Sequence, residues 1–312
     1  MPIALACTLF AALVAAPPSD AAGDAAAEGP TAPPPPVSAA TPQAEEDAEI
    51  TAEDAAADPF SVDLAVDLPI LGLTAAVAFG TEMIRDQLIW EGCHACDTSH
   101  LGPLDRRVLD NYNEGAKITS DVLLYGSVAV PAIVDFADVL IHRRTIGRWG
   151  RSYAKDFAVL AEVATVNFAL TNVVKFAVLR PRPYTYGLDG SDRDPTEGDA
   201  QLSFYSGHTS TAFAMATAYS YLFQARHPTS KWRAPVWVLS YGLASTTGVM
   251  RVVAGKHFWS DVIVGAIAGS AIGLAIPALH RRRPSARRFA GPVNLNLAAS
   301  RFGSTVALRG SF

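Results

Sequence analysis

The feature that most constrains this chain is a series of uncharged, largely apolar segments in its second half. Residues 209–225 and 234–250 each supply 17 positions without a charge, and residues 262–279 supply 18. Residues 157–174 supply another 18, with Glu162 as their one charged residue. A helix needs about 17 to 25 such residues to cross a membrane. These segments predict helices embedded in a membrane, although the core of a soluble helical protein would also accept them.

We expect an all-α fold, a bundle of about six helices. Their expected ranges are residues 68–90, 116–141, 153–179, 206–225, 235–253 and 261–279. The second has only 13 consecutive uncharged positions, so it is a weaker candidate for a membrane crossing. The first is expected to lie on the outer surface if an N-terminal signal is removed. Gly265, Gly269 and Gly273 put small residues on one face of the last helix, which permits close contact with another helix.

Charge separates an acidic N-terminal part from a basic remainder. The first 63 residues contain eleven acidic and no basic residues, whereas the rest contains 25 basic and 19 acidic ones. Residues 1–21 include an apolar run typical of a signal peptide or an uncleaved anchor. Residues 22–60 are rich in Ala, Pro and acidic groups, which predicts a disordered linker. We assign residues 61–288 to one domain and residues 289–312 to a C-terminal tail, where brief alternation fits a short β-hairpin.

Basic residues are concentrated in three loops that share one side if the last four helices cross a membrane. These loops hold Arg143, Arg144, Arg148, Arg151, Lys155, Arg226, Lys231, Arg233, Arg281, Arg282, Arg283, Arg287 and Arg288. Loops rich in Lys and Arg remain in the cytoplasm. The opposite helix ends are therefore expected to face away from it.

Three polar clusters lie at those opposite ends, in residues 175–183 (KFAVLRPRP), 205–208 (YSGH) and 251–261 (RVVAGKHFWSD). Lys175, Arg182 and Arg251 supply three cations, which suit a phosphate dianion. Ser206 and Gly207 fall at an expected helix start, where free backbone N–H groups favour an anion. Each cation taken alone could equally be an ordinary basic residue at a helix end.

Two histidines in these clusters can divide acid–base work. One must be neutral to attack phosphorus, and the other must be protonated to assist the leaving oxygen. Asp261 follows His257 by four residues, so a helix would place both on one side. Asp261 could then hold the tautomer of His257, or it could simply be a negative charge at a helix start.

The order and inner spacing of these clusters resemble the type-2 phosphatidic acid phosphatase (PAP2) superfamily. Its pattern is K-x6-R-P, then P-S-G-H, then S-R-x5-H-x3-D, and this sequence matches it from Lys175 to Asp261. Tyr205 replaces the usual proline and Met250 the frequent serine. Neither change removes a proton-transfer group, so they put substrate preference in doubt more than catalysis.

The resemblance implies a role for each matching residue. His257 would attack phosphorus to form a phosphohistidine, Asp261 would orient His257, and His208 would protonate the leaving alcohol and then activate water. The phosphate would be bound by Lys175, Arg182, Ser206, Gly207 and Arg251. The family reaction uses no metal or other cofactor, and these motifs supply no carboxylate cage for one.

The expected function is hydrolysis of a phosphomonoester or diphosphate, with a lipid as the preferred carrier. The expected location is a bacterial inner membrane, with the site facing the periplasm. The alternatives are a soluble periplasmic acid phosphatase, a phosphotransferase, a vanadium haloperoxidase and a non-catalytic envelope protein. Nothing in the sequence indicates a nucleic-acid partner, and protein partners are not identified.

Cys93 and Cys96 form a close pair separated by His94 and Ala95. A local disulfide is the leading interpretation in an oxidising periplasm. Free thiols, zinc binding with His94 or His100, and redox exchange are the alternatives.

Overall fold

A computed structural model describes residues 58–89, 96–109, 111–186, 199–282, 294–300 and 303–309. The expected signal or anchor and most of the expected linker lie outside these residues and remain predictions. Phe60, which the expected linker included, is buried. The backbone N–H of Ser61 donates to the carbonyl of His280. The packed body therefore extends at least as far back as Phe60.

The prediction of an all-α body is confirmed. Its long helices are α3 (Leu64–Met83), α6 (Glu114–Ile141), α8 (Trp149–Val178), α9 (Gly207–Arg226), α10 (Arg233–Val253) and α11 (Trp259–His280). Short helical turns connect them at α4 (Arg85–Leu88), α5 (Pro103–Arg106), α7 (Arg143–Ile146) and η1 (Pro183–Tyr186).

Local sequence explains where several helices begin and end. The side chains of Asp63, Asn113 and Ser206 accept backbone hydrogen bonds at the starts of α3, α6 and α9. These bonds satisfy N–H groups that have no partner within the helix. Leu179 adopts a left-handed conformation, with φ of 47°, and stops α8 two residues before Pro181.

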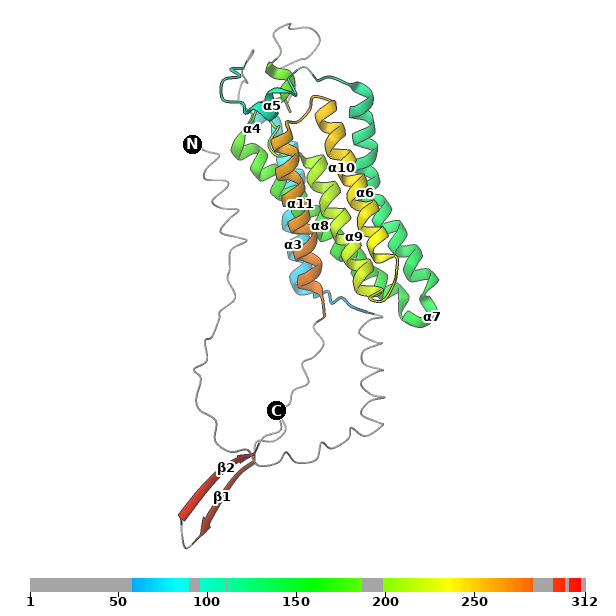
Figure 1. The fold of residues 1–312 in the computed structure, drawn as a ribbon, viewed down its shortest axis with the longest axis vertical. Helices are drawn as coiled ribbons and strands as arrows, with labels where there is room; N and C mark the ends of the chain where they lie inside the picture. The colour runs from blue at the N-terminus through cyan, green and yellow to red at the C-terminus, as the bar shows by residue number, and fades with distance from the viewer. Residues whose placement is uncertain are drawn as a thin grey trace. The chain divides into compact units, whose positions relative to one another are not determined.

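Helix α9 is the centre of the bundle and contacts α6, α8, α10 and α11 (Figure 1). Its contact with α11 depends on the glycine stripe. A Cβ atom built on Gly265, Gly269 or Gly273 would come within 2.8 Å, 2.0 Å or 2.2 Å of a backbone oxygen of α9 or its cap. Only glycine lets the two backbones approach so closely.

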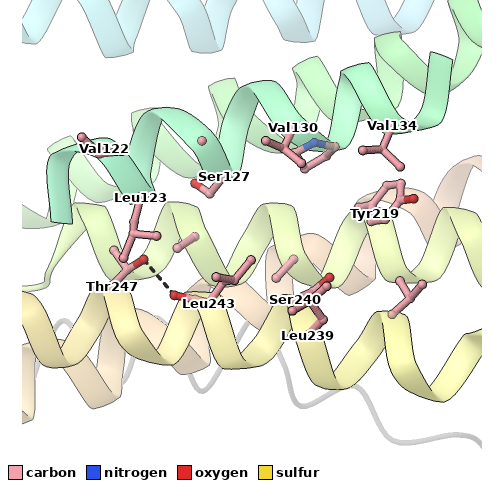
Figure 2. Close-up of a pocket in the computed structure, with 16 residues that line it drawn as sticks. Val122, Leu123, Ser127, Val130, Val134, Tyr219, Leu239, Ser240, Leu243 and Thr247 are labelled. Atoms are coloured by element: carbon pink, nitrogen blue, oxygen red, sulfur yellow. Dashed lines mark hydrogen bonds between the residues drawn. The ribbon is translucent and has the colours of Figure 1, made fainter. Parts of the chain in front are cut away.

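An apolar cavity of about 430 Å³ lies between α6 and α10, with α9 at its back (Figure 2). One end is formed by Val122, Leu123 and Thr247, and the other by Val134 and Tyr219. Gly126 lines the wall on α6, where a Cβ atom would meet nothing within 4 Å. The cavity is therefore long and apolar, and Gly126 leaves part of its wall without a side chain.

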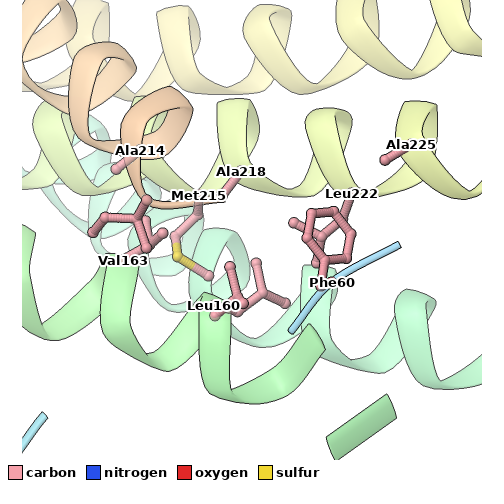
Figure 3. Close-up of a cluster of buried hydrophobic side chains, with 10 residues drawn as sticks. Phe60, Leu160, Val163, Ala214, Met215, Ala218, Leu222 and Ala225 are labelled. Carbon is pink, nitrogen blue, oxygen red and sulfur yellow. The ribbon is translucent and has the colours of Figure 1, made fainter. Parts of the chain in front are cut away.

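The main hydrophobic core lies where α8, α9 and α11 meet the segment before α3 (Figure 3). It contains Phe60, Leu160, Val163, Ala214, Met215, Ala218, Leu222, Ala225, Val159 and Ile276. The small residues all come from α9, which again allows close helix packing.

Five long helices, α3, α6, α8, α10 and α11, are long and apolar enough to cross a membrane. Their outward faces include large exposed apolar side chains such as Leu73, Phe79 and Val238. This composition fits a membrane protein. Helix α3 packs on α8 and is itself apolar enough to cross, so its expected place on the outer surface remains a prediction. Helix α6, the weaker candidate in the sequence, is also apolar enough to cross.

Helix α9 contains the uncharged residues 209–225, which were a candidate for a crossing, yet it is not among those five. The reason is its central position, since it faces protein on most sides. Buried Ser210, Thr211 and Thr217 face neighbouring helices and find hydrogen-bond partners there or within α9. A helix that has little contact with lipid can keep such polar groups.

The segment from Arg282 to Phe312 is a separate unit. Strands β1 (Asn294–Ser300) and β2 (Gly303–Arg309) pair antiparallel there, with Ser300 opposite Gly303. This hairpin lies in the tail where the sequence alternates.

Candidate active site

Helix ends bring the three polar clusters together at one end of the bundle. Here α8 and α10 finish, and α9 and α11 begin. A cavity of about 200 Å³ at this end is lined by Lys175, Arg182, Gly207, His208, Arg251 and His257. Six of the eight residues expected to act on phosphate therefore share one cavity. Ser206 and Asp261 lie behind it, each fully buried.

Three arginines line this cavity, Arg85, Arg182 and Arg251, and the two from the motifs are held by groups around them. Arg182 donates from Nε to the carbonyl of Asp199 at 2.8 Å, and its Nη2 lies 2.6 Å from the Asp199 carboxylate. Arg251 Nη1 donates to Ser120 at 3.2 Å and to Asp121 at 3.3 Å. Among the described residues, nothing accepts from the buried Nε of Arg251. A buried donor without a partner is costly, and an anion in the cavity would satisfy it.

The start of α9 adds backbone N–H groups to these cations. A Cβ atom on Gly207 would lie 3.3 Å from Thr171 and 3.6 Å from Nζ of Lys175. Glycine therefore leaves space beside the lysine. The Ser206 hydroxyl accepts from the hydroxyl of Thr209 at 3.0 Å, and from its N–H at 3.5 Å, so it caps the helix. The region combines a helix N-terminus with three cations, an arrangement suited to a tetrahedral anion.

His257 lies in the connection between α10 and α11 and is 1% exposed. Its Nδ1 is 2.8 Å from the backbone carbonyl of Ser203. A carbonyl only accepts, so Nδ1 carries the proton and Nε2 keeps the lone pair. Burial, together with Arg182, Arg251 and Lys175, places the pKa of His257 well below its ordinary value. The imidazole is therefore neutral, as a nucleophile must be.

Asp261 was expected to orient His257 directly, but the distances assign that contact to another group. Asp261 Oδ2 is 3.8 Å from Nδ1 of His257, beyond hydrogen-bond reach. This oxygen instead accepts from the Ser203 hydroxyl at 2.6 Å and from the Phe258 N–H at 3.0 Å. Asp261 thus holds Ser203, whose carbonyl in turn holds His257.

Arg180 is a functional neighbour that the sequence analysis missed. It pairs with Asp261 through Nη1 and with Asp105 through Nη2, the latter at 2.9 Å. Its guanidinium also lies 4.2 Å from the centre of the Phe258 ring. Ser260 donates to the same Asp105 carboxylate at 2.6 Å. The start of α11 is therefore fixed by a buried charge network. Arg180 lies between Lys175 and Arg182 in the sequence, and this position was the signal that could have revealed it.

Asp121 was also missed, because no spacing in α6 marks it. Its Oδ1 accepts from Nε2 of His208 at 2.8 Å and from Arg251. The other ring nitrogen of His208, Nδ1, is then the one that could exchange a proton with a molecule bound in the cavity. Burial, followed by Arg251, Lys175 and Arg182, lowers the pKa of His208 to about 2. Without an anion, this histidine is neutral.

This electrostatic balance predicts that a dianion binds together with a proton. The negative charge of a bound anion offsets the three cations and should raise the pKa of His208. Sulfate is a suitable probe because it stays a dianion in mild acid. We expect its affinity to rise as the pH falls from about 7 to about 5, by at most about tenfold per pH unit. Calorimetric titration would measure this, and His208→Gln should lose the pH dependence. Equal affinity of the original chain at both pH values would contradict the coupling.

Cys93 lies outside the described residues, so its pairing with Cys96 remains a prediction. Cys96 is disulfide-bonded and buried, and its sulfur lies 3.4 Å from the Thr185 hydroxyl. Thr185 in turn donates to the carbonyl of Arg182. The segment that contains Cys96 therefore contacts the loop that carries one of the site's cations.

Comparison with known proteins agrees with these motifs. Residues 157–285 match the model of the PAP2 superfamily. The lipid A 1-phosphatase of Porphyromonas gingivalis is 33% identical over 125 residues, which cover 40% of this chain and 23% of that protein. Human phospholipid phosphatase 2 is 29% identical over 182 residues, which cover 51% of this chain and 62% of that protein. The chain spans less than two thirds of the length of either relative.

The motifs that line the site lie within or next to the part of the chain that is similar to the PAP2 superfamily. Among solved structures, the chain is similar to the first transmembrane PAP2 type phosphatidylglycerolphosphate phosphatase from Bacillus subtilis. The identity is 18% and the TM-score 0.41, over 68% of this chain and 94% of that one.

Proposed function

We propose that this protein is a phosphatase that hydrolyses a phosphomonoester or diphosphate on a lipid, through a phosphohistidine. The observation that carries the proposal is the state of His257. It is neutral, its Nδ1 is held by Ser203, and it lines a cavity with the three motif cations, Lys175, Arg182 and Arg251, and a second histidine. This arrangement provides a nucleophile, an anion cradle and a proton donor in one place.

In the first step, Nε2 of His257 forms a bond to phosphorus, and the bond from phosphorus to the leaving oxygen breaks. Lys175, Arg182 and Arg251 stabilise the negative charge on the other phosphate oxygens. His208, protonated once the anion is bound, gives its proton to the leaving oxygen. In the second step, His208 takes a proton from water, whose oxygen attacks phosphorus and releases phosphate from His257.

A lipid is the preferred substrate because the apolar cavity begins next to this site. Asp121 and Leu124 flank Val122 and Leu123, which form the near end of that cavity. Thr247 lies one helical turn before Arg251 on α10. A phosphate at the cations would leave an attached hydrocarbon chain beside the opening between α6 and α10.

The proposed location is a bacterial inner membrane, with the site on the periplasmic side. The basic residues of α7, of the turn between α9 and α10, and Arg281 lie at the opposite end of the bundle from the site. Loops of this kind stay in the cytoplasm. Lipid phosphates would then reach the site from the outer leaflet.

Phosphate release in detergent with EDTA tests this function and its substrate class. We expect activity on long-chain lipid phosphates that exceeds activity on a soluble aryl phosphate. In Gly126→Phe, the new ring should fill the cavity and lower kcat/KM for the long-chain lipids by about tenfold or more, while the aryl phosphate is unaffected. Gly242→Phe is the matched control, because Gly242 lies on α10 outside the cavity and its Cβ would also meet open space.

Other outcomes point to the alternative functions. Equal turnover of lipid and aryl phosphates, unchanged in Gly126→Phe, would favour an acid phosphatase that does not use the cavity. A folded protein that releases no phosphate would contradict hydrolysis. Transfer to added alcohols and vanadate-dependent halide oxidation would then be measured.

A further inference from the structure

Three ionisable side chains meet at the end of the bundle away from the phosphate cavity. Asp67 lies in the first turn of α3, Glu162 in α8, and His280 at the end of α11. All three are buried, with exposed fractions of 6%, 6% and 9%. Ionisable groups in apolar helices are costly, so a group of three from separate helices needs an explanation.

The core surrounds this group with hydrocarbon. Leu160 and Val163 flank Glu162 along α8, and Ile276 precedes His280 by one turn (Figure 3 shows the two α8 residues). Phe60 belongs to the same cluster, and the next residue, Ser61, donates to the carbonyl of His280. The two carboxylates therefore have little solvation by water, and they need compensation from groups within the protein.

His280 presents one particular nitrogen to these carboxylates. Its Nδ1 is 2.9 Å from the carbonyl of Ile276, which can only accept. Nδ1 therefore holds a proton, and Nε2 faces the carboxylates at 3.4 Å from Asp67 Oδ1 and 3.3 Å from Glu162 Oε2. A histidine whose far nitrogen donates to a backbone carbonyl is the usual form of a metal ligand.

These distances suit a coordination shell better than two ion pairs. Charge-assisted hydrogen bonds between nitrogen and oxygen are about 2.7–2.9 Å long. In a tetrahedral shell with bonds of about 2.0–2.1 Å, adjacent ligand atoms lie about 3.3–3.4 Å apart. One ligand atom from each of the three residues lies within 4.8 Å of the other two. Asp67 also uses its second oxygen to accept from the Asp63 N–H, which leaves Oδ1 for the shared point.

The net charge of this group of three side chains also favours a bound cation. Among the described residues, neither Asp67 nor Glu162 has a Lys or Arg within 4.0 Å, and His280 is the one basic group paired with them. With both carboxyl groups ionised, the group would keep a net negative charge even with His280 protonated. A divalent cation would neutralise both carboxylates and leave the imidazole neutral.

We propose that Asp67, Glu162 and His280 bind a divalent transition-metal ion, with zinc as the first candidate. Two carboxylates and one imidazole are ligands that zinc accepts, with a fourth position for water. The ion would join the start of α3 to α8 and the end of α11. His280 follows Asp261 by 19 residues of one helix, or about 28 Å, so this ion would take no part in phosphate chemistry.

A second group, Asp138, His142 and His227, offers an internal control. Its ligand atoms also lie within 4.8 Å of one another. However, His227 Nε2 is already at hydrogen-bond distance from Asp138, at 2.7 Å, and the His142 side chain is 46% exposed. Its polar groups are satisfied without an ion.

The test is metal content of the full-length protein, purified with any histidine tag removed and dialysed against zinc and then buffer. We expect about one zinc per chain, measured by mass spectrometry, in the original chain and in the control variant His142→Ala/His227→Ala. Glu162→Gln and His280→Ala should lose most of it. Cobalt substitution gives a second measurement, because a bound cobalt ion should produce visible absorption bands that Glu162→Gln abolishes.

The outcomes are separable from those for phosphatase activity. If wild-type protein holds no zinc and no cobalt, the proposal is wrong and the three groups form a buried ion cluster instead. Zinc that is lost only from the His142/His227 variant would also overturn it. A metal-binding protein without phosphatase activity would refute the proposed function alone.

Discussion

The rate of phosphate release should fall by at least about 10⁴-fold in His257→Ala, because losses of this size follow removal of a nucleophile. The substitution removes Nε2, while the cations of the cavity remain. The measurement is phosphate release in detergent on the preferred substrate. His257→Gln is a useful second variant, because its amide can still donate to the Ser203 carbonyl and preserve packing. His142→Ala, at the opposite end of the bundle, is the control and should keep full activity.

A direct observation of the intermediate strengthens this test. Wild-type protein mixed briefly with a labelled substrate and quenched should carry label that is stable to base and lost in acid, as expected for phosphohistidine. His257→Ala should carry none. Full activity in a folded His257→Ala protein would show that another group attacks phosphorus.

Arg180→Ala should lower the free energy of unfolding by about 3–5 kcal/mol, the range for breaking a buried ion pair on one side. The variant leaves the carboxylates of Asp105 and Asp261 without their cation, and the Asp261 side chain is 0% exposed. Denaturant unfolding of the protein in detergent measures the change. Activity should also fall, because the Asp261–Ser203 contact that holds His257 loses its anchor.

Two further variants make the interpretation specific. Arg180→Lys keeps the charge but cannot reach both carboxylates with a planar fork, so it should be intermediate. Arg143→Ala removes an exposed arginine and should change stability by less than about 0.5 kcal/mol. An Arg180→Ala protein as stable as wild type would mean that the two carboxylates are compensated by other groups.

Much of this molecule could be predicted from its sequence, because charge and periodicity fix helices locally. The six expected helices correspond to α3, α6, α8, α9, α10 and α11, and most of their ends agree within a few residues. The cavity residues could be found for a different reason. Lys175, Arg182, His208, Arg251 and His257 occur at spacings that a known family shares.

What could not be predicted depends on contacts between distant segments. Asp121 lies 87 residues before His208 and has no motif around it. The Ser203 carbonyl that holds His257 is a backbone atom, which no side-chain pattern reveals. Asp67 and Glu162 appear in the sequence as isolated charges in apolar helices, and only packing brings them to His280.

The glycine contact between α9 and α11 bears on how such an enzyme can change. Ser206, Gly207 and His208 lie at the start of α9, and His257 just precedes α11. The distance between these groups is therefore set by how closely the two helix backbones pack. Mutation can scarcely adjust it, because any larger residue at Gly265, Gly269 or Gly273 would strike main-chain atoms. The walls on α6 and α10 are ordinary side chains that can be exchanged one at a time. If the proposed function is correct, substitutions in these walls can change which lipid is bound while the reaction chemistry stays the same.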